Sequence, residues 1–511
     1  MTAIELTGTG IGREEVVAVG REGARVAVAA EARAAMERSA AVVERLAASE
    51  EPVYGVSTGF GSLATTPIPA ARREELQRAL IRSHAAGMGP PVEREVVRGT
   101  MLLRARSLAM GYSGARPELA EGLVAMLNAG ITPVVPEHGS LGASGDLAPL
   151  AHCALVLIGE GEASDADGVV RPGAAALAAA GLEPITLRAK EGLALINGTD
   201  GILAMLVLAC WDLRRLLRAA DVAAAMSVEA LLGTDRAFAA DLIDLRPQPG
   251  QAASAANLRR LLAGSEIVAS HREGDPRVQD AYSLRCAPQV LGAARDALAY
   301  AESVAGAELA SAIDNPMVLP DGRVESCGNF HGAPLGLACD LLAIAAADAG
   351  AIAERRTDRL LDASRSHGLP SFLADDPGVN SGLMIPHYAQ AAMVAENRRL
   401  AAPAGVDSLP TSAMQEDHVS MGWGAARKLR ASLANLTRIV AVELACAARG
   451  LDLRRPLSPA PGTAAARDAI RAALAGPGPD RFLAPELADA ERLVADGAVL
   501  AAVTDAIGEL E

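Results

Sequence analysis

Aromatic residues are scarce in this chain of 511 residues, at 2% of the total, although half of the residues are hydrophobic. Alanine supplies much of the apolar content, and alanine-rich, aromatic-poor sequence favours long helices that pack closely. No uninterrupted apolar run reaches the ~18–20 residues of a membrane span. The opening stretch MTAIELTGTGIGREE lacks the basic start and apolar core of a signal peptide. These absences predict a mainly helical protein without a membrane partner.

An excess of positive charge is also missing, because the formal net charge is −15 at pH 7. Such a chain does not attract nucleic acid or an anionic membrane surface, so neither is expected as a partner. The six cysteines are scattered without a CxxC pair, which is typical of reduced thiols in the cytoplasm rather than of a disulfide framework. The eight histidines form no HxxxH, HxH or Cys/His cluster, so no metal site is expected.

The pattern of the chain changes near residue 205. Residues 1–205 mix short helices with glycine-rich loops, whereas residues 206–511 carry long apolar repeats at three- and four-residue spacing. We therefore predict a mainly α fold: a long-helix bundle core (206–511) with a smaller mixed, loop-rich N-terminal domain (1–205). The longest predicted helices are Gln279–Ile313, Leu335–Leu361, Leu383–Leu400 and Met414–Arg449.

In the segment GSLGASGDLAPL, Gly139–Leu150, small and flexible residues directly precede a predicted apolar helix. One interpretation is a helix start with Ser144 or Asp146 as the N-cap. A second is compatible with it: if Gly145 N attacks the Ala143 carbonyl and two waters leave, Ser144 becomes a methylidene on an imidazolone, a strong electrophile. Ala-Ser-Gly is common, so the tripeptide alone is a weak signal. A Ser-His-Asp hydrolase is not favoured, because GASGD is not GxSxG.

Two of the five tyrosines stand in motifs that could carry chemistry. Tyr54 opens the glycine-rich loop YGVSTGFG, where it is either a loop anchor or a general base on a lid. Gln279, Tyr282 and Arg285 follow one another at three-residue spacing, so neighbouring members share a helix face. Amide, phenol and guanidinium together suit a carboxylate ligand. A solvated polar face is an equally good interpretation of this spacing.

Three polar breaks between apolar runs are weak motifs when taken singly. INGTDG contains Asn197, and SCGNFHGAP contains Phe330 and His331, all of which could be turn residues. MQEDHVSMGWG is expected to open a long helix with Glu416 and His418 in its first turn, where acidic residues also stabilise the helix dipole.

The whole series of motifs resembles the aromatic amino acid ammonia-lyases, from about Val16 to Leu451. The segments that carry this resemblance, in the order of that family, are YGVSTGFG, SHAAGMGP, GSLGASGDLAPLAH, KEGLALINGTDG, VQDAYSLRCAPQV, DNPMV, GNFHGAP, RSHGLPSFL, SGLMI and QEDHVSMGW. Each piece alone would be unspecific, but the ordered set is very specific.

The resemblance implies a prosthetic group built from the chain itself. Ala143, Ser144 and Gly145 are similar to the precursors of 4-methylidene-imidazol-5-one, which forms autocatalytically and needs no external cofactor. Tyr54 resembles the residue that takes the β-proton, and Tyr282 its partner beside the group. Some relatives have Cys where Ala143 stands, and some have Asn at Ser57; neither position supplies the methylidene.

The resemblance also implies the residues that bind substrate. Arg285 is similar to the clamp on the substrate carboxylate, Asn197 and Gln279 to residues that bond the prosthetic group or substrate, and Phe330 to a residue that packs nearby. His84 and Glu416 together resemble the histidine-specific pattern, to which the segment SGLMI adds Met384. An imidazole buried in the pocket needs polar partners, which these two side chains can supply, whereas a phenyl ring would leave Glu416 unpaired.

The sequence therefore predicts a carbon–nitrogen lyase that eliminates ammonia from L-histidine, without oxidation or hydrolysis, to give trans-urocanate, the first step of histidine degradation. Whether the electrophile meets the amine or the imidazole ring stays open, with the amine favoured. The resemblance further implies a homotetramer whose sites each use more than one subunit, and the scattered cysteines predict that it is cytoplasmic. The alternatives are a tyrosine or phenylalanine ammonia-lyase, an aminomutase with the same prosthetic group, and a catalytically silent helical oligomer.

Overall fold

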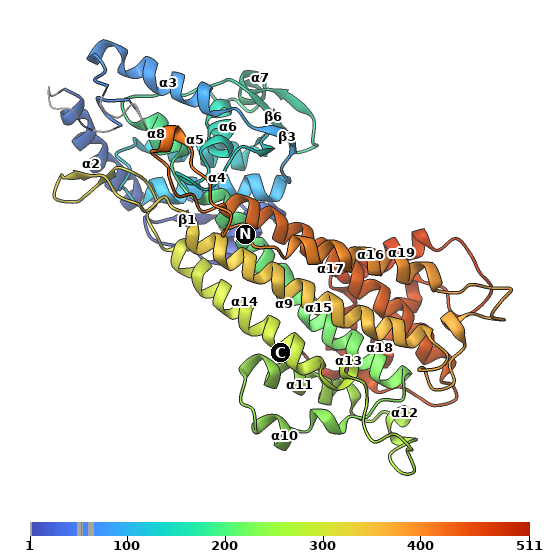
Figure 1. Cartoon of the computed structure of the whole chain (residues 1–511). Coiled ribbons are helices and arrows are strands. Elements are labelled where there is room, and N and C mark those ends of the chain that lie inside the picture. The colour runs from blue at the N-terminus through green and yellow to red at the C-terminus, as the bar shows by residue number, and fades with distance from the viewer. Residues whose placement is uncertain (1–2, 49–52, 54, 60–65) are drawn as a thin grey trace. The chain divides into compact units, whose positions relative to one another are not determined.

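The structure, a computed structural model, describes residues 3–48, 53, 55–59 and 66–511 (Figure 1). The prediction for Tyr54 falls outside these residues.

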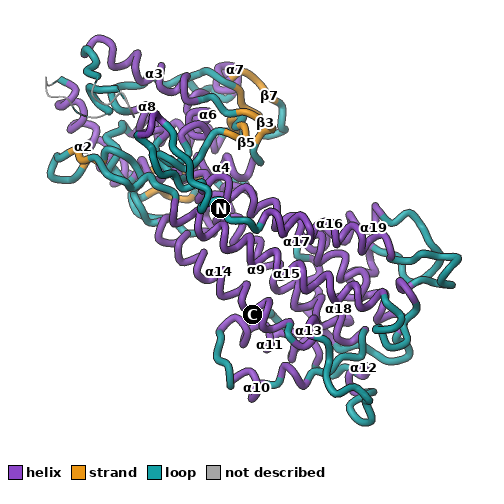
Figure 2. The backbone as a smooth tube through the Cα atoms, viewed as in Figure 1, coloured by secondary structure: helices purple, strands orange, loops and turns teal. Residues whose placement is uncertain are grey.

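Helices dominate the fold, which confirms the predicted fold class (Figure 2). The α-helices are α1 Arg13–Val17, α2 Ala30–Ala47, α3 Arg73–His84, α4 Arg94–Ala109, α5 Pro117–Asn128, α6 Leu147–Leu157, α7 Gly173–Ala179, α8 Glu191–Ile196, α9 Asp200–Ala230, α10 Ala240–Asp244, α11 Pro249–Leu262, α12 Glu266–Ala269, α13 Tyr282–Arg285, α14 Ala287–Leu309, α15 Ala333–Leu361, α16 Met384–Leu400, α17 Gly422–Leu453, α18 Pro461–Ala473, α19 Ala484–Ala495 and α20 Ala498–Ile507.

The chain forms two compact units, each assembled from three separate segments. Unit 1 consists of Met1–Leu208, Ala301–Cys339 and Pro403–Arg427. Unit 2 consists of Ala209–Tyr300, Asp340–Ala402 and Lys428–Glu511. Segments far apart in the sequence are therefore neighbours inside one unit.

Unit 1 is built around α4, whose residues 96–109 are all buried. Helices α1, α2, α5 and α6 pack against it. Its strands form small sheets: parallel β1–β2, antiparallel β3–β5, antiparallel β4–β6–β7 and antiparallel β8–β9. The strands are β1 Ile4–Leu6, β2 Val26–Val28, β3 Met88–Pro91, β4 Thr132–Pro133, β5 Pro136–His138, β6 Glu162–Ser164, β7 Val170–Pro172, β8 Met317–Val318 and β9 Val324–Glu325.

Three helices of unit 1 bring predicted site residues together at their ends. Helices α3, α6 and α8 pack against one another in pairs. His84 is the last residue of α3, Asn197 directly follows α8, and the segment 143–145 precedes α6. The packing of these three helices therefore brings the residues at their ends close together.

Unit 2 is a set of long helices joined by buried polar side chains. Glu443 on α17 accepts hydrogen bonds from Arg356 Nη2 on α15, at 2.8 Å, and from Ser227 Oγ on α9, also at 2.8 Å. Helices α11 and α14 approach so closely that a Cβ built on Gly250 would lie 2.1 Å from the Gly292 carbonyl oxygen. Small residues thus permit the close helix packing that the alanine-rich composition predicts.

Two of the four long predicted helices match the structure and two do not. Helices α15 and α16 correspond to Leu335–Leu361 and Leu383–Leu400 within two residues. The predicted helix Gln279–Ile313 is instead the short α13 followed by α14, and Gln279 precedes both.

The helix predicted from Met414 begins at Gly422, so the prediction that Glu416 and His418 lie in its first turn is wrong. Ser412, Ala413, Met414 and Met421 all have positive φ, between 50° and 70°. A right-handed helix cannot continue through such residues, so residues 415–421 form a loop.

Helices α15 and α17 are long and apolar enough to cross a membrane by length and composition, with mean hydropathy of 1.8 and 1.4 in their most apolar windows. However, 67% and 78% of these windows are buried inside the protein. Core helices of a globular fold pass the same test, so these two helices are weak evidence for a membrane span.

Candidate active site

A pocket of about 940 Å³ in unit 1 collects six of the predicted site residues. Its size lies in the range of small-molecule sites, roughly 300–1,000 Å³. The predicted residues that line it are His84, Ala143, Ser144, Asn197, Phe330 and Glu416. Residues separated by more than 300 positions in the sequence therefore share one cavity.

The loop of residues 141–145 is held from two sides. On one side, Gly145 pairs with Gly198, and a Cβ built on Gly145 would lie 2.0 Å from the Gly198 carbonyl oxygen. On the other side, the Leu141 carbonyl accepts a hydrogen bond from Met421 N at 2.8 Å, and the Gly142 carbonyl accepts one from Ser420 Oγ at 3.0 Å. Gly145 has φ of +71°, a left-handed conformation that favours glycine. Glycine is thus required at this position for both space and conformation.

Asp146 fixes the end of this loop to helix α9. It stands at the N-cap position of α6, but among the described residues its carboxylate accepts from elsewhere: Gly201 N at 2.8 Å, Ile202 N at 2.9 Å and Ser140 Oγ at 3.0 Å. The side chain is fully buried, and this burial raises its pKa to about 7 against the opposing effect of these hydrogen bonds. The first N–H groups of α9, which have no partner within the helix, are satisfied in this way.

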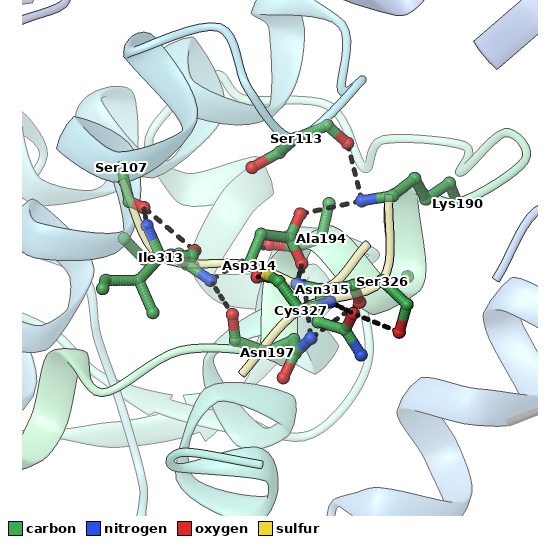
Figure 3. Close-up of polar contacts among 12 residues, drawn as sticks. Ser107, Ser113, Lys190, Ala194, Asn197, Ile313, Asp314, Asn315, Ser326 and Cys327 are labelled. Atoms are coloured by element: carbon green, nitrogen blue, oxygen red, sulfur yellow. Dashed lines mark hydrogen bonds and ion pairs between the residues drawn. The ribbon is translucent and has the colours of Figure 1, made fainter. Parts of the chain in front are cut away.

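Asn197 lines the pocket and carries a buried acceptor that has no partner among the described residues. Only 2% of its surface is exposed. Its Nδ2 donates to the Asn315 carbonyl at 2.8 Å and lies 3.4 Å from Asp314 Oδ1 (Figure 3). Within the described part of the chain, its Oδ1 has no hydrogen-bond partner. A buried amide oxygen of this kind is normally bonded, so a group bound in the pocket is its natural partner.

His84 and Glu416 line the same pocket, as the substrate argument requires. His84 Nδ1 lies 2.9 Å from the Leu80 carbonyl, which can only accept, so the proton of the neutral ring is on Nδ1 and Nε2 keeps its lone pair. Burial lowers the pKa of His84, and the charge of Glu416 opposes this shift. Glu416 Oε2 accepts a hydrogen bond from Thr411 Oγ1 at 2.7 Å. Two polar groups are therefore available for a heteroaromatic ring.

Two pocket histidines were not predicted as site residues. The rings of His331 and His418 stack with centroids 5.9 Å apart and planes inclined by 7°. His331 Nε2 also donates to the His418 carbonyl at 3.1 Å. Both residues stand in motifs that the sequence singles out, but they are 87 positions apart, and nothing local in the sequence indicates that they stack.

Four predicted site residues belong to unit 2 rather than to this pocket. Tyr282 is 71% exposed, and the Arg285 guanidinium carbon lies 4.6 Å from the centre of its ring. Arg285 Nε donates to the Asp280 carbonyl at 2.9 Å. Gln279 is exposed before α13, and Met384 is the first residue of α16. Among the described residues, those that line the 940 Å³ pocket include none of these four.

The side chains that could ligate a metal are dispersed. Within residues 3–48, 53, 55–59 and 66–511, no group of three or more His, Cys, Asp or Glu side chains could hold an ion. The six cysteines are free thiols.

Similarity to known proteins extends over nearly the whole chain. The family model described as aromatic amino acid lyase matches residues 11–472. The histidine ammonia-lyase of Streptomyces avermitilis is 61% identical over 503 residues, which cover 98% of each protein. The histidine ammonia-lyase of Deinococcus radiodurans is 52% identical over 475 residues, covering 93% of this chain and 90% of that protein.

Solved structures match over the same length. A tyrosine aminomutase from Streptomyces globisporus has a TM-score of 0.94 at 37% identity and covers 100% of both chains. The histidine ammonia-lyase from Trypanosoma cruzi has a TM-score of 0.91 at 40% identity, covering 99% of this chain and 96% of that one. The same fold is thus found in an aminomutase and in an ammonia-lyase.

Proposed function

The chain belongs to the aromatic amino acid lyase family, and on this premise we propose that it eliminates ammonia from L-histidine to give trans-urocanate. The observation that carries the choice of substrate is the presence of His84 and Glu416 in one pocket. A histidine side chain has two ring nitrogens that need partners when buried, whereas a phenyl ring offers no hydrogen-bond partner to His84 Nε2 or to the Glu416 carboxylate. A site of this kind can discriminate sharply between substrates.

The family implies a 4-methylidene-imidazol-5-one formed by Ala143, Ser144 and Gly145. Two observations support the fit of these residues to the group. Gly145 is in a left-handed conformation in a space that excludes any side chain. Asn197, whose Oδ1 has no partner among the described residues, lines the same pocket as Ala143 and Ser144. The group supplies an electrophile that no ordinary side chain offers.

The remaining roles concern binding and proton transfer by the chain's own side chains. Arg285 would hold the substrate carboxylate, because a guanidinium grips it with two hydrogen bonds. Phe330 would pack against the ring, and Met384 would contribute to the specificity of the site. Tyr54 would take the β-proton, which requires its pKa to be lowered from ~10 by positive charge or hydrogen bonds.

We propose that each site in a homotetramer is completed by a neighbouring subunit. Gln279, Tyr282 and Arg285 carry the chemistry expected at the site but do not line the pocket of unit 1. The 71% exposure of Tyr282 supports this proposal, because a catalytic phenol is expected to be enclosed in the working enzyme. We place this enzyme in the cytoplasm, where its six free thiols would stay reduced.

An aminomutase is the second candidate, because the tyrosine aminomutase structure matches this chain so closely. The two activities differ in whether ammonia leaves or returns to the carbon skeleton. Product analysis by mass spectrometry separates them, since a β-amino acid retains the mass of its substrate. A catalytically silent oligomer would instead show no loss of two waters in its intact mass.

The decisive experiment is a parallel assay with L-histidine, L-tyrosine and L-phenylalanine, following the ultraviolet absorbance of each conjugated acid. We expect a rise with L-histidine alone. A rise with only L-tyrosine or L-phenylalanine would contradict the roles of His84 and Glu416 while leaving the lyase chemistry in place. The Ser144→Ala variant is the control, because without the serine hydroxyl no methylidene can form and turnover should be lost.

A further inference from the structure

We propose that the buried Lys190–Asp314 ion pair is a positioning device that fixes the orientation of the side-chain amide of Asn197, a residue that lines the pocket. The inference rests on the proposed function, because it assigns a role to a residue of that same site. Lys190 and Asp314 are positioning residues, since neither lines the pocket in the described part of the chain.

The ion pair is fully enclosed. Lys190 Nζ lies 2.8 Å from Asp314 Oδ2, and the exposed fractions of the two side chains are 0% and 1%. Lys190 Nζ also donates to the Ser113 carbonyl at 2.8 Å, so the ammonium sits between Ser113 and Asp314 (Figure 3). Lysine is rarely buried to this extent, and a buried ion pair costs desolvation that its mutual attraction does not always recover. Stability alone is therefore a poor explanation for this arrangement.

Helix α8 connects the ion pair to Asn197. Lys190 is the residue before α8, with φ of +66°, and Asn197 is the residue after it. A non-glycine residue in this left-handed conformation is strained, and such strain concentrates at functional positions. All six residues of α8 are buried, which makes the helix a fixed spacer between the lysine and the asparagine.

Asp314 decides the orientation of the Asn197 amide. The two atoms that face Asn197 Nδ2 are both acceptors: the Asn315 carbonyl oxygen at 2.8 Å and Asp314 Oδ1 at 3.4 Å. Rotating the amide by 180° would bring Oδ1 against two oxygens, one of them charged. Asp314 Oδ1 also accepts from Asn315 N at 2.7 Å, which holds the Asn315 backbone in place.

These contacts hold the side-chain amide of Asn197 in one orientation. Nδ2 is committed to the network, and Oδ1 has no partner among the residues that the structure describes. Asn315 continues the network, because its Oδ1 accepts from Cys327 N at 2.8 Å and Ser326 Oγ at 3.0 Å, and both of these residues line the pocket. An acceptor that is oriented before substrate binds requires no reorganisation during the reaction.

The test is a double-mutant cycle on the intact enzyme. Asp314→Asn replaces the carboxylate with an amide of the same shape, whose N–H groups can face Asn197 and favour the rotated orientation. We expect kcat for L-histidine to fall at least tenfold with a smaller change in KM. In the Asn197→Ala background, Asp314→Asn should change kcat by less than twofold, because the group through which it acts is gone.

Two controls separate positioning from stability. Asp221→Asn removes the carboxylate partner of Arg295 in unit 2, where Asp221 is also fully buried, and it should lower the Tm while leaving kcat within twofold. Asp314→Asn leaves the buried Lys190 ammonium without its carboxylate partner. If that variant does not fold, Lys190→Met/Asp314→Asn removes the ammonium as well and replaces it in the double-mutant cycle. Equal kcat losses with and without Asn197, or an unchanged kcat in a folded variant, would overturn the proposal.

A second readout does not depend on turnover. The dissociation constant of trans-urocanate, measured by isothermal titration calorimetry, should weaken at least threefold in Asp314→Asn and be unaffected by that change in the Asn197→Ala background. If the wild type is active but the effect of Asp314→Asn does not depend on Asn197, the positioning role is contradicted and the proposed function is not. A wild type that neither turns over L-histidine nor binds trans-urocanate contradicts the proposed function, and the positioning role falls with it.

Discussion

The Thr411 hydroxyl donates a hydrogen bond of 2.7 Å to Glu416 Oε2. The same two residues pair through their backbones, with Thr411 N donating to the Glu416 carbonyl at 2.9 Å and Glu416 N donating to the Thr411 carbonyl at 3.3 Å. Thr411 therefore closes a small loop that holds the carboxylate at the pocket. This loop, and not a turn of helix α17, presents Glu416 to the pocket.

Removing the Thr411 hydroxyl should impair the use of L-histidine. A hydrogen bond to a charged group contributes about 1.5–3 kcal/mol, so Thr411→Val should lower kcat/KM for L-histidine by about tenfold to a hundredfold. Thr411→Ser keeps the hydroxyl and should retain most of the activity. Glu416→Gln removes the charge of the carboxylate and should lower turnover more than it lowers the Tm. Steady-state kinetics and the Tm of each variant test this. The control is Thr437→Val, whose hydroxyl donates to the Leu433 carbonyl of its own helix α17 at 2.9 Å; equal losses in both valine variants would contradict the role of Thr411.

Gly145→Ala should prevent the prosthetic group from forming. The added Cβ would lie 2.0 Å from the Gly198 carbonyl oxygen, and φ is +71°. Gly168→Ala is the matched control: φ is +81° there, but the added Cβ would meet no atom within 4 Å. Gly168→Ala should cost only about 1–2 kcal/mol of conformational strain and keep full activity. Intact mass measures the outcome directly, and a loss of two waters in Gly145→Ala would refute this prediction.

The sequence predicted the helical fold, because helices depend on local patterns of apolar residues. Apolar spacing located α15 and α16 closely. Helix propensity could not locate the start of α17, since positive φ at Ala413 and Met421 follows from tertiary contacts rather than from residue type. The motif residues Ser144, Asn197 and Glu416 did meet in one cavity, although only their family resemblance indicated that they would.

Other parts of the site lay beyond any pattern in the sequence. Lys190 stands inside a motif that the sequence singles out, but its complete burial is unusual for a lysine and depends on Asp314, 124 positions away. The stacking of His331 on His418 is likewise a long-range contact. Such contacts form when distant segments fold into one unit, which residue order alone does not reveal.

Glu229 should make the stability of the protein depend on pH. Its side chain is fully buried, and burial raises its pKa from 4.5 to about 7. Between these values the folded state holds a proton that the unfolded state releases, so the free energy of unfolding falls as pH rises, by about 1.4 kcal/mol per pH unit for one group.

Glu229→Gln removes this titration while keeping an acceptor for Ala460 N, which lies 2.7 Å from Glu229 Oε1. The Tm of the variant relative to wild type should therefore rise from pH 5 to pH 7 and level off above it. Thermal unfolding at a series of pH values tests this. A difference in Tm that is the same at pH 5 and pH 8 would show that Glu229 is not the source of the dependence.

Mixed tetramers should recover activity if the site is shared between subunits. Ser144→Ala and Arg285→Ala should each be inactive, because one lacks the electrophile and the other the carboxylate clamp. If Ser144 and Arg285 of one site come from different chains, random mixing of the two variants leaves both intact in about a quarter of the sites. Coexpressed variants with different affinity tags, purified through both tags, should then show roughly that fraction of wild-type turnover. If both residues of a site came from the same chain, every site would carry one defect and no mixture would be active, which would contradict the shared site while leaving the lyase activity itself untouched.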